Sequence, residues 1–294
     1  MIYPLIPSFV KSVLGLGPAF LGILEGIAES TNSILKLFAG YFSDKIKKRK
    51  PFAVGGYAIS NLLRPLIGLT RFWGVLLFLR FSDRVEVPEK YLTRDKNTIG
   101  KKEILKFSDF KKLGKQFSLY LVVLVIFTLG NSTDAFLLLR ASEVGFQITV
   151  IPLLWAILHI SKALFCILGG YISDKIGRKV MILSGWFVYF LTYLGFAYFN
   201  EYYLIYLLFI IYGLYFGLTE GVEKALVVDI VPKENIGTAF GFYNLSLGIA
   251  TLPASIIFGF IWKTYSFRAA FLTGALISII SAIMLVFLKL GKKQ

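Results

Sequence analysis

Polar and ionisable side chains stand at helical spacing inside one of the apolar blocks of this sequence. They are four residues of the block Ala19–Ser43, separated by four, three and four positions: Glu25, Glu29, Asn32 and Lys36. This spacing places them on one face of a helix, and in hydrocarbon such a face is expected to line protein or a water-filled cavity. The carboxylates could carry protons or bind a polar solute. The alternative is a buried ion pair, such as Glu29 with Lys36 or Lys162, that only holds helices together.

A second set of polar residues occupies the equivalent positions 130 residues later: Trp155, His159, Lys162 and Cys166. The two sets are pseudo-symmetric, as expected for two helices that flank a shared central path. His159 is the only histidine of the chain. It could be a proton-linked group or a hydrogen-bonded histidine of the core.

Asn131 and Asp134 lie one turn apart at the start of the second half of the sequence. Asp134 has no cation within four residues on its helix, and burying it ionised is costly unless another helix supplies one. It is therefore a candidate proton carrier or cation-binding group. The alternative is a position near the outer interface, since Arg140 and Glu143 follow it.

A further charged group lies near the end of the block Tyr202–Val228. Glu220 and Lys224 are four residues apart and are expected to pair with each other inside the membrane. We favour a structural role for them and for the neighbouring Glu223. In the same block, Gly213, Gly217 and Gly221 form a face that permits close helix contact.

The elements that position these residues are apolar helices. Of 294 residues, 56% are hydrophobic and 17% charged, with a mean hydropathy of +0.72. The apolar residues gather in blocks of about 20, the length that crosses a bilayer as a helix. The sequence predicts an all-α polytopic membrane protein with these segments: Ile2–Gly15, Ala19–Ser43, Phe52–Thr70, a stub at Phe72–Phe81, Phe117–Leu139, Thr149–Ile172, Val180–Phe199, Tyr202–Val228, Thr238–Trp262 and Arg268–Leu288.

The net charge of +15 reports topology rather than a nucleic-acid partner. Lys and Arg cluster between the apolar blocks at 45–50, 84–115, 175–179 and 289–293, as the positive-inside rule predicts for loops on the cytoplasmic side of a cell membrane in contact with anionic lipid. With one cysteine and one histidine, we expect no metal site, no cofactor and no enzyme activity. The absence of a P-loop disfavours a pump driven by ATP.

An internal repeat divides the chain into two halves. The segment G-Y-F-S-D-K-I at 40–46 matches G-Y-I-S-D-K-I at 170–176 at six of seven positions. After Gly170 four spans occupy 124 residues, about 31 residues each. At that length, the 95 non-linker residues between the two copies hold about three spans, whereas a symmetric 6+6 protein needs six there. We expect a truncated transmembrane half at 1–83, about three and a half helices, a basic cytoplasmic linker at 84–116 and a complete six-helix half at 117–294.

The two repeated loops resemble the signature G-x-x-x-D-x-x-G-R-R/K of the major facilitator superfamily of secondary transporters. The second copy is complete, whereas the first has Lys47 at the second glycine. The resemblance implies that the end of helix 4 and helices 5 and 6 are absent. It also implies gating loops that bias the inward–outward equilibrium, formed by Gly40, Asp44, Lys45 and Arg49 and by Gly170, Asp174, Gly177, Arg178 and Lys179. The alternative is that these charges only mark the membrane interface.

The resemblance predicts a secondary transporter that moves a small solute by alternating access. The sequence leaves the coupling ion open, and proton coupling through Asp134, Glu29 or Glu25 is a subsidiary hypothesis from the residues themselves. The alternative is an internally deleted or degenerate member without transport activity, which persists as a membrane-embedded interaction protein. A homo-oligomer, in the simplest case a homodimer, is one way to complete the missing wall.

Overall fold

The computed structural model describes residues 3–46, 110 and 113–290, with the backbone alone over residues 34–46. Everything described is helical or in short connections. The elements in order are η1 (Tyr3–Leu5), α1 (Ile6–Ser12), α2 (Pro18–Ile46), α6 (Lys115–Gly130), α7 (Ala135–Val144), α8 (Ile151–Ile176), α9 (Arg178–Tyr198), α10 (Tyr202–Ile230), η4 (Lys233–Asn235), α11 (Ile236–Thr264) and α12 (Phe267–Phe287).

The second half of the chain holds six segments long and apolar enough to cross a membrane, as the sequence predicts. The first of them departs from the predicted single helix Phe117–Leu139, because α6 ends at Gly130 and α7 begins only at Ala135. The residues between are Asn131, Ser132, Thr133 and Asp134. Short polar side chains of this kind compete with the backbone for hydrogen bonds, so a run of four favours an interruption.

The first half begins differently from the predicted segment Ile2–Gly15. It forms η1 and the short helix α1, and the chain then turns at Gly15, whose φ of +65° suits glycine. Helix α2 starts at Pro18, a residue favoured in the first turn of a helix, and runs to Ile46. The predicted segments at 52–70 and 72–81, and most of the predicted linker, lie outside the described residues.

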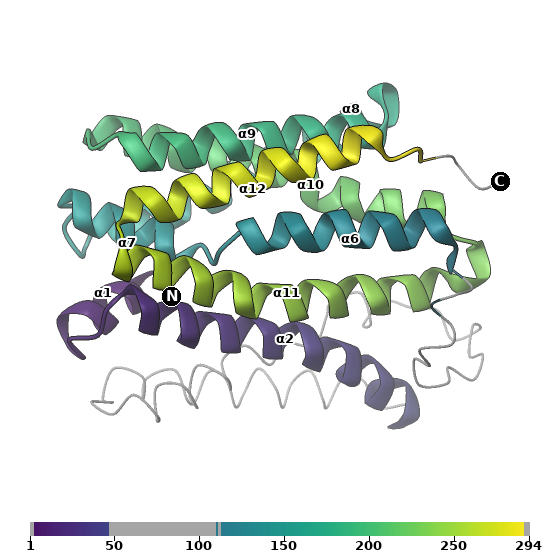
Figure 1. The fold of residues 1–294 in the computed structure, drawn as a ribbon, viewed down its shortest axis with the longest axis horizontal. Helices are drawn as coiled ribbons and strands as arrows, with labels where there is room; N and C mark the ends of the chain where they lie inside the picture. The colour runs from purple at the N-terminus through teal and green to yellow at the C-terminus, as the bar shows by residue number, and fades with distance from the viewer. Residues whose placement is uncertain (1–2, 47–109, 111–112, 291–294) are drawn as a thin grey trace.

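The long helices lie side by side in one bundle with their axes along the longest dimension of the molecule (Figure 1). Helix α2 packs along α11, α8 packs along α10, and α9 contacts both α10 and α12. Helix α6 lies against α11 and α12. The residues that the first half contributes to the described bundle therefore join the second half chiefly through α11.

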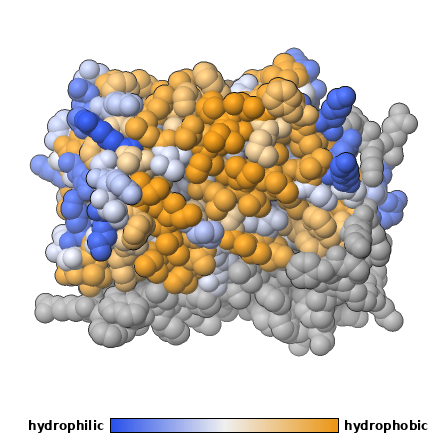
Figure 2. All heavy atoms as spheres, viewed as in Figure 1, coloured by the Kyte–Doolittle hydropathy of each residue, from blue (hydrophilic) through white to orange (hydrophobic). Residues whose placement is uncertain are grey.

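The surface has the polarity of a membrane protein. Figure 2 shows hydrophobic side chains over the middle of the bundle and hydrophilic ones gathered at the two ends of the helices. Helix α8 illustrates the pattern, since Ile160, Leu164 and Ile167 are all well exposed along it. Large apolar side chains exposed at one-turn intervals suit contact with lipid.

Glycines let α8 and α10 approach each other closely. A Cβ at Gly217 would lie 2.6 Å from the carbonyl carbon of Phe165, and a Cβ at Gly213 would lie 2.8 Å from the backbone nitrogen of Lys162. Gly221 differs, because nothing lies within 4 Å of its added Cβ. Two of the three glycines of the predicted face therefore make the close contact, and the third does not.

Replacing Gly217 by alanine should destabilise the bundle, whereas the same change one turn later should not. The Gly217→Ala methyl group must push two backbones apart, and overpacking of this kind costs about 1–3 kcal/mol. Thermal unfolding of the purified protein in detergent measures the difference. Gly221→Ala is the matched control, and equal melting temperatures for the two variants would contradict the close packing described.

Candidate functional site

The interruption between α6 and α7 is surrounded by tyrosines. The hydroxyl of Tyr189 on α9 donates to the Gly130 carbonyl at 2.9 Å, at the point where α6 ends. The last carbonyls of a helix have no partner within it. In a bundle that excludes water, an unsatisfied carbonyl is costly. The hydrogen bond from Tyr189 therefore removes the energetic cost of an unpaired carbonyl at the end of α6.

The polar side chains of the interruption are also held by tyrosine hydroxyls. Tyr212 donates to Asp134 Oδ1 at 2.9 Å, and the amide Nδ2 of Asn131 donates to the Tyr215 hydroxyl at 3.0 Å. Ser132 Oγ and the Tyr193 hydroxyl lie 3.3 Å apart. Asn131 and Asp134 are only partly buried, whereas the tyrosines behind them are fully or almost fully buried. The arrangement presents one amide and one carboxylate on a rigid aromatic wall.

The aromatic rings stiffen this wall through contacts with one another. Tyr189 and Tyr193 stack with their centroids 4.1 Å apart, and Tyr212 and Tyr215 lie 5.4 Å apart. Tyr189 also meets Tyr215 edge to face at 5.0 Å. Aromatic pairs in these geometries add stability beyond the burial of their area. The hydroxyls that hold the interruption are therefore fixed in position.

Tyr3, in the first segment of the chain, reaches the same region. Its hydroxyl lies 3.2 Å from Thr133 Oγ1, and its ring lies 4.5 Å from the ring of Trp155 on α8. Trp155 is followed by His159, whose ring lies 4.4 Å from it and whose Nδ1 is 2.9 Å from the Trp155 carbonyl. The structure thus links His159 to the interruption through two aromatic side chains.

Lys162 and Glu220 form an ion pair between α8 and α10. Lys162 Nζ lies 2.7 Å from Glu220 Oε2, and Lys224 Nζ lies 3.3 Å from Glu220 Oε1. Lys162 also sits over the ring of Phe216 at 4.1 Å. The sequence anticipates the contact of Glu220 with Lys224 but not that with Lys162. This group carries one net positive charge and is partly exposed.

The predicted polar residues of α2 are buried to different degrees. Glu25 is 0% exposed, whereas Glu29 and Asn32 are partly buried. Helix α2 packs on α11, while α9 and α10 provide the tyrosines around Asp134. The side chain of Lys36 lies outside the described residues. Glu25 and Glu29 both make contacts with their surroundings, so the buried side chain of Glu25 has a partner in the folded protein.

The second repeated loop ties four helices, α8, α9, α10 and α12, together at one end of the bundle. Arg178 Nη1 lies 2.7 Å from Asp174 Oδ1, and Arg178 Nε lies 3.4 Å from Asp229 Oδ2 on α10. Lys179 donates to the Val286 and Leu288 carbonyls at the end of α12. Gly177, at φ +95°, makes the turn, and Gly170 begins the motif on α8. In the first copy, the side chains of Asp44 and Lys45, together with Gly40, fall in the backbone-only part of α2, and Arg49 lies outside the described residues.

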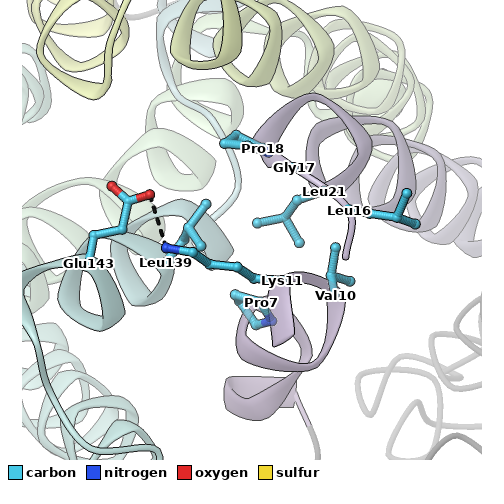
Figure 3. A pocket seen from close by; sticks show the side chains of 9 residues that line it. All are labelled: Pro7, Val10, Lys11, Leu16, Gly17, Pro18, Leu21, Leu139 and Glu143. Atoms are coloured by element: carbon cyan, nitrogen blue, oxygen red, sulfur yellow. Dashed lines mark hydrogen bonds and ion pairs between the residues drawn. The ribbon is translucent and has the colours of Figure 1, made fainter. Parts of the chain in front are cut away.

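The opposite end of the bundle is joined by a different ion pair. Lys11 Nζ on α1 lies 3.4 Å from Glu143 Oε1 on α7. Figure 3 shows this contact at the edge of a small pocket between α1, the start of α2 and α7, lined by Pro7, Val10, Lys11, Leu16, Gly17, Pro18, Leu21, Leu139 and Glu143. The pair links the first half of the chain to the second.

Comparison with known proteins decides the family. The sequence model of the Major Facilitator Superfamily matches residues 95–294. The chain belongs to the major facilitator superfamily. It is therefore a membrane secondary transporter by family, with several spans across the bilayer.

Superfamily relatives support this assignment over most of the chain. An uncharacterised MFS-type transporter of Methanocaldococcus jannaschii is 30% identical over 361 residues, which cover 98% of this chain and 90% of that protein. The multidrug resistance efflux pump PmrA of Streptococcus pneumoniae is 30% identical over 44% of this chain and 33% of the pump. Crystal structures of the nucleoside transporter NupG and of a mutant of it give TM-scores of 0.75 and 0.80 at 12% identity, covering 96% and 97% of this chain and 93% and 94% of theirs. At that identity the similarity shows the fold alone.

The alignment with the archaeal relative from Methanocaldococcus jannaschii also shows how many of its residues have no counterpart in this chain. Since 98% of 294 residues is about 288, about 73 of the 361 aligned positions have no counterpart in this chain. At the 31 residues per span of the second half, this is about two and a half helices. This shortfall is close to the two and a half to three spans that the internal repeat predicts to be missing from the first half.

Several residues of this site are absent from the sequence-based interpretation. They are the tyrosines Tyr189, Tyr193, Tyr212 and Tyr215, with Ser132 and Thr133 of the interruption. Their spacing carries a signal, because the two on α9 are four residues apart and the two on α10 are three apart, which places each pair on one helix face. Within the described residues, no group of three or more His, Cys, Asp or Glu could hold a metal ion.

Removing the Tyr189 hydroxyl should destabilise the superfamily fold at the interruption. Tyr189→Phe keeps the ring but leaves the Gly130 carbonyl without its donor, and an unsatisfied buried polar group costs about 1–3 kcal/mol. The melting temperature in detergent reports this loss. Tyr203→Phe is the control, because that side chain is 70% exposed. If Tyr189→Phe melts no earlier than Tyr203→Phe, the hydrogen bond is not a support of the interruption.

Proposed function

We propose that this chain carries a small solute across a cytoplasmic membrane by alternating access and binds it at the interruption 131–134. The observation that carries the proposal is the pairing of a partly buried amide and carboxylate, Asn131 and Asp134, on a wall of buried tyrosines inside an apolar bundle. Polar groups kept at this depth are costly and usually mark a solute or ion path. Trp155, His159 and Lys162 on α8 extend the same path.

Proton coupling is the finer part of the proposal. Asp134 is a carboxylate held by a tyrosine donor, and Glu29 and Glu25 on α2 are further acids that could take up a proton. A relative from Planococcus maritimus, 27% identical over 40% of this chain and 29% of its own length, is named a Na(+), Li(+), K(+)/H(+) antiporter. That name supports an ion gradient as the energy source here.

The basic loops give the orientation we propose. Asp174, Arg178 and Lys179 would lie on the cytoplasmic side with the C-terminus, and Lys11 and Glu143 on the outer side. The Lys11–Glu143 contact would then hold the outer end closed, because it joins the two halves of the chain there. At the opposite, cytoplasmic end, the contacts of the repeated loops would bias the equilibrium between the inward-open and outward-open conformations.

A second function is favoured by the shortened N-terminal half. With about two and a half helices missing relative to the archaeal relative, the chain could persist as a membrane-embedded interaction protein without transport activity. A homo-oligomer that supplies the missing wall would instead preserve transport. Crosslinking in native membranes separates these cases, since only the transporting oligomer needs a second copy.

Asp134→Asn should abolish the part of solute flux that a pH gradient drives. The variant keeps an acceptor for Tyr212 but can no longer bind a proton. Uptake and efflux of a broad solute panel in proteoliposomes with an imposed pH gradient measure this, with the exposed Glu201→Gln as control. Gradient-driven flux that survives in Asp134→Asn would exclude this residue as the carrier, and no flux of any solute through the unmodified protein would count against transport.

Breaking the Lys11–Glu143 pair should raise the population of the conformation with an open outer end by a small factor. The two side chains are 51% and 25% exposed, and such pairs contribute about 0–1 kcal/mol, which shifts a two-state equilibrium no more than about five-fold. The reporter is Val10→Cys in a Cys166→Ser background, labelled with a membrane-impermeant maleimide. Glu143→Gln should raise the labelling rate, and the exchange Lys11→Glu with Glu143→Lys should restore it. A rate that the exchange fails to restore would mean that the pair does not close this end.

A further inference from the structure

A second acidic group is enclosed within the C-terminal half, away from the interruption. Glu223 on α10 is 7% exposed, and both of its carboxyl oxygens accept hydrogen bonds from neutral donors. Trp186 Nε1 on α9 donates to Oε1 at 3.3 Å, and the Tyr243 hydroxyl on α11 donates to Oε2 at 3.1 Å. Three helices thus converge on this one side chain.

No cation pairs with Glu223 among the described residues. The nearest lysine in sequence, Lys224, lies 3.3 Å from Glu220, which also takes Lys162. The charged and titratable groups that interact with Glu223 are Lys224, Glu220 and Tyr215 on α10, Tyr243 on α11 and Tyr120 on α6. A buried carboxylate without a paired cation is expensive, so this enclosure does not suit a permanent charge.

The enclosure can satisfy both protonation states of the carboxyl group. The ionised form accepts from Trp186 and Tyr243. In the protonated form, one oxygen still accepts from Trp186, whose indole nitrogen can only donate, while the new O–H group can donate to the Tyr243 oxygen. The Tyr120 hydroxyl on α6 is buried without a hydrogen-bond partner, and it interacts electrostatically with Glu223 and Tyr243. When the Glu223 O–H group donates to Tyr243, the Tyr243 O–H bond stays intact but turns away from Glu223, and the Tyr120 oxygen is a candidate acceptor for it.

One face of α10 connects this enclosure with the interruption. Tyr212, Tyr215, Thr219 and Glu223 follow one another at three- and four-residue spacing, and Thr219 donates to the Tyr215 carbonyl at 2.9 Å. Tyr212 is bound to Asp134 at one end of this row. Eleven residues separate Tyr212 from Glu223, about 16 Å along the axis at ~1.5 Å per residue. The two acids therefore lie at different depths of the same bundle, with buried polar side chains between them.

We propose that Glu223 is a second proton-binding site of this chain. Within the enclosure of Trp186, Tyr243 and Tyr120, its carboxylate takes up one proton to become a carboxylic acid and gives the same proton up again. The inference rests on the proposed function only for what the proton is used for. The binding itself is a property of the enclosure and needs no solute. Glu223 would hold the proton between Asp134 and the end of the bundle that carries Asp174 and Arg178.

The test is difference infrared spectroscopy of the full chain in lipid vesicles, recorded as the pH is lowered. The unmodified protein should gain a carbonyl band of protonated carboxylic acid, and Glu223→Gln should lose that band. Glu220→Gln is the matched control one turn earlier, and because Glu220 is paired with two lysines it should leave the band in place. Tyr243→Phe, which removes one hydrogen bond, should shift the frequency of the band without removing it.

The outcomes separate this inference from the proposed transport function. A band that Glu223→Gln retains overturns the inference, and so does a band that Glu220→Gln removes. If Glu223→Gln does not fold, an unshifted band in Tyr243→Phe overturns it instead. Loss of the band in Asp134→Asn rather than in Glu223→Gln would support the proposed role of Asp134 and reject that of Glu223. Absence of solute flux leaves the infrared result unaffected.

Discussion

The constraint on which the rest of this structure depends is that every polar group inside the bilayer must find its partner within the protein. The bundle interrupts a membrane helix at residues 131–134 and thereby leaves the last carbonyls of α6 without partners inside that helix. Tyr189 takes the freed carbonyl, and Tyr193, Tyr212 and Tyr215 hold the side chains of the interruption. The tyrosines of α9 and α10 thus supply the hydrogen bonds that stabilise one irregular segment of backbone.

Close packing of the helices around that segment follows from the same constraint. Next to the interruption α6, α9 and α12 are held at short distances, and glycine makes those distances accessible. Gly274 of α12 is an example, since an added Cβ would lie 2.7 Å from the Gly130 carbonyl and 2.8 Å from the ring of Tyr193. The carbonyl that Tyr189 satisfies is therefore approached from the other side by a residue without a side chain. Close helix packing by Gly274 and the hydrogen bond from Tyr189 therefore act on the same carbonyl group.

Much of the fold could be read from the sequence because span length and charge distribution are local properties. The six spans of the second half follow from apolar blocks of the right length, and the deficit of the first half follows from the spacing of two repeated loops. The break at Asn131–Asp134 was missed, because hydrophobicity averaged over a span hides four polar residues. Asp134 could be singled out as an ionisable residue in an apolar block, whereas its partner Tyr212 lies 78 positions away in sequence, and only the packing of α10 brings the two together.

The same reasoning explains why Glu223 and Glu220 have different environments although they lie on one helix near each other. On sequence alone both read as members of one charged group with Lys224. Their separation of three residues turns them toward different neighbours, so that Glu220 faces Lys162 on α8 while Glu223 points between α9 and α11. A carboxyl group between two lysines is fixed as an anion, whereas one among indole and phenol donors is free to change its charge. Helix packing, not residue type, therefore decides which of the two acids can do proton chemistry.

Asp134 and Glu223 both lie among helices of the six-helix second half. α6, α9, α10 and α11 provide the side chains around them, and the first half reaches the interruption through Tyr3. Apart from that of Tyr3, the hydrogen bonds described above at the interruption and at Glu223 therefore come from helices of the second half. Proton binding at these two acids, as proposed above, would then not require the missing helices of the first half. A chain of this kind would keep its buried acids even where solute movement had become slow or had ceased.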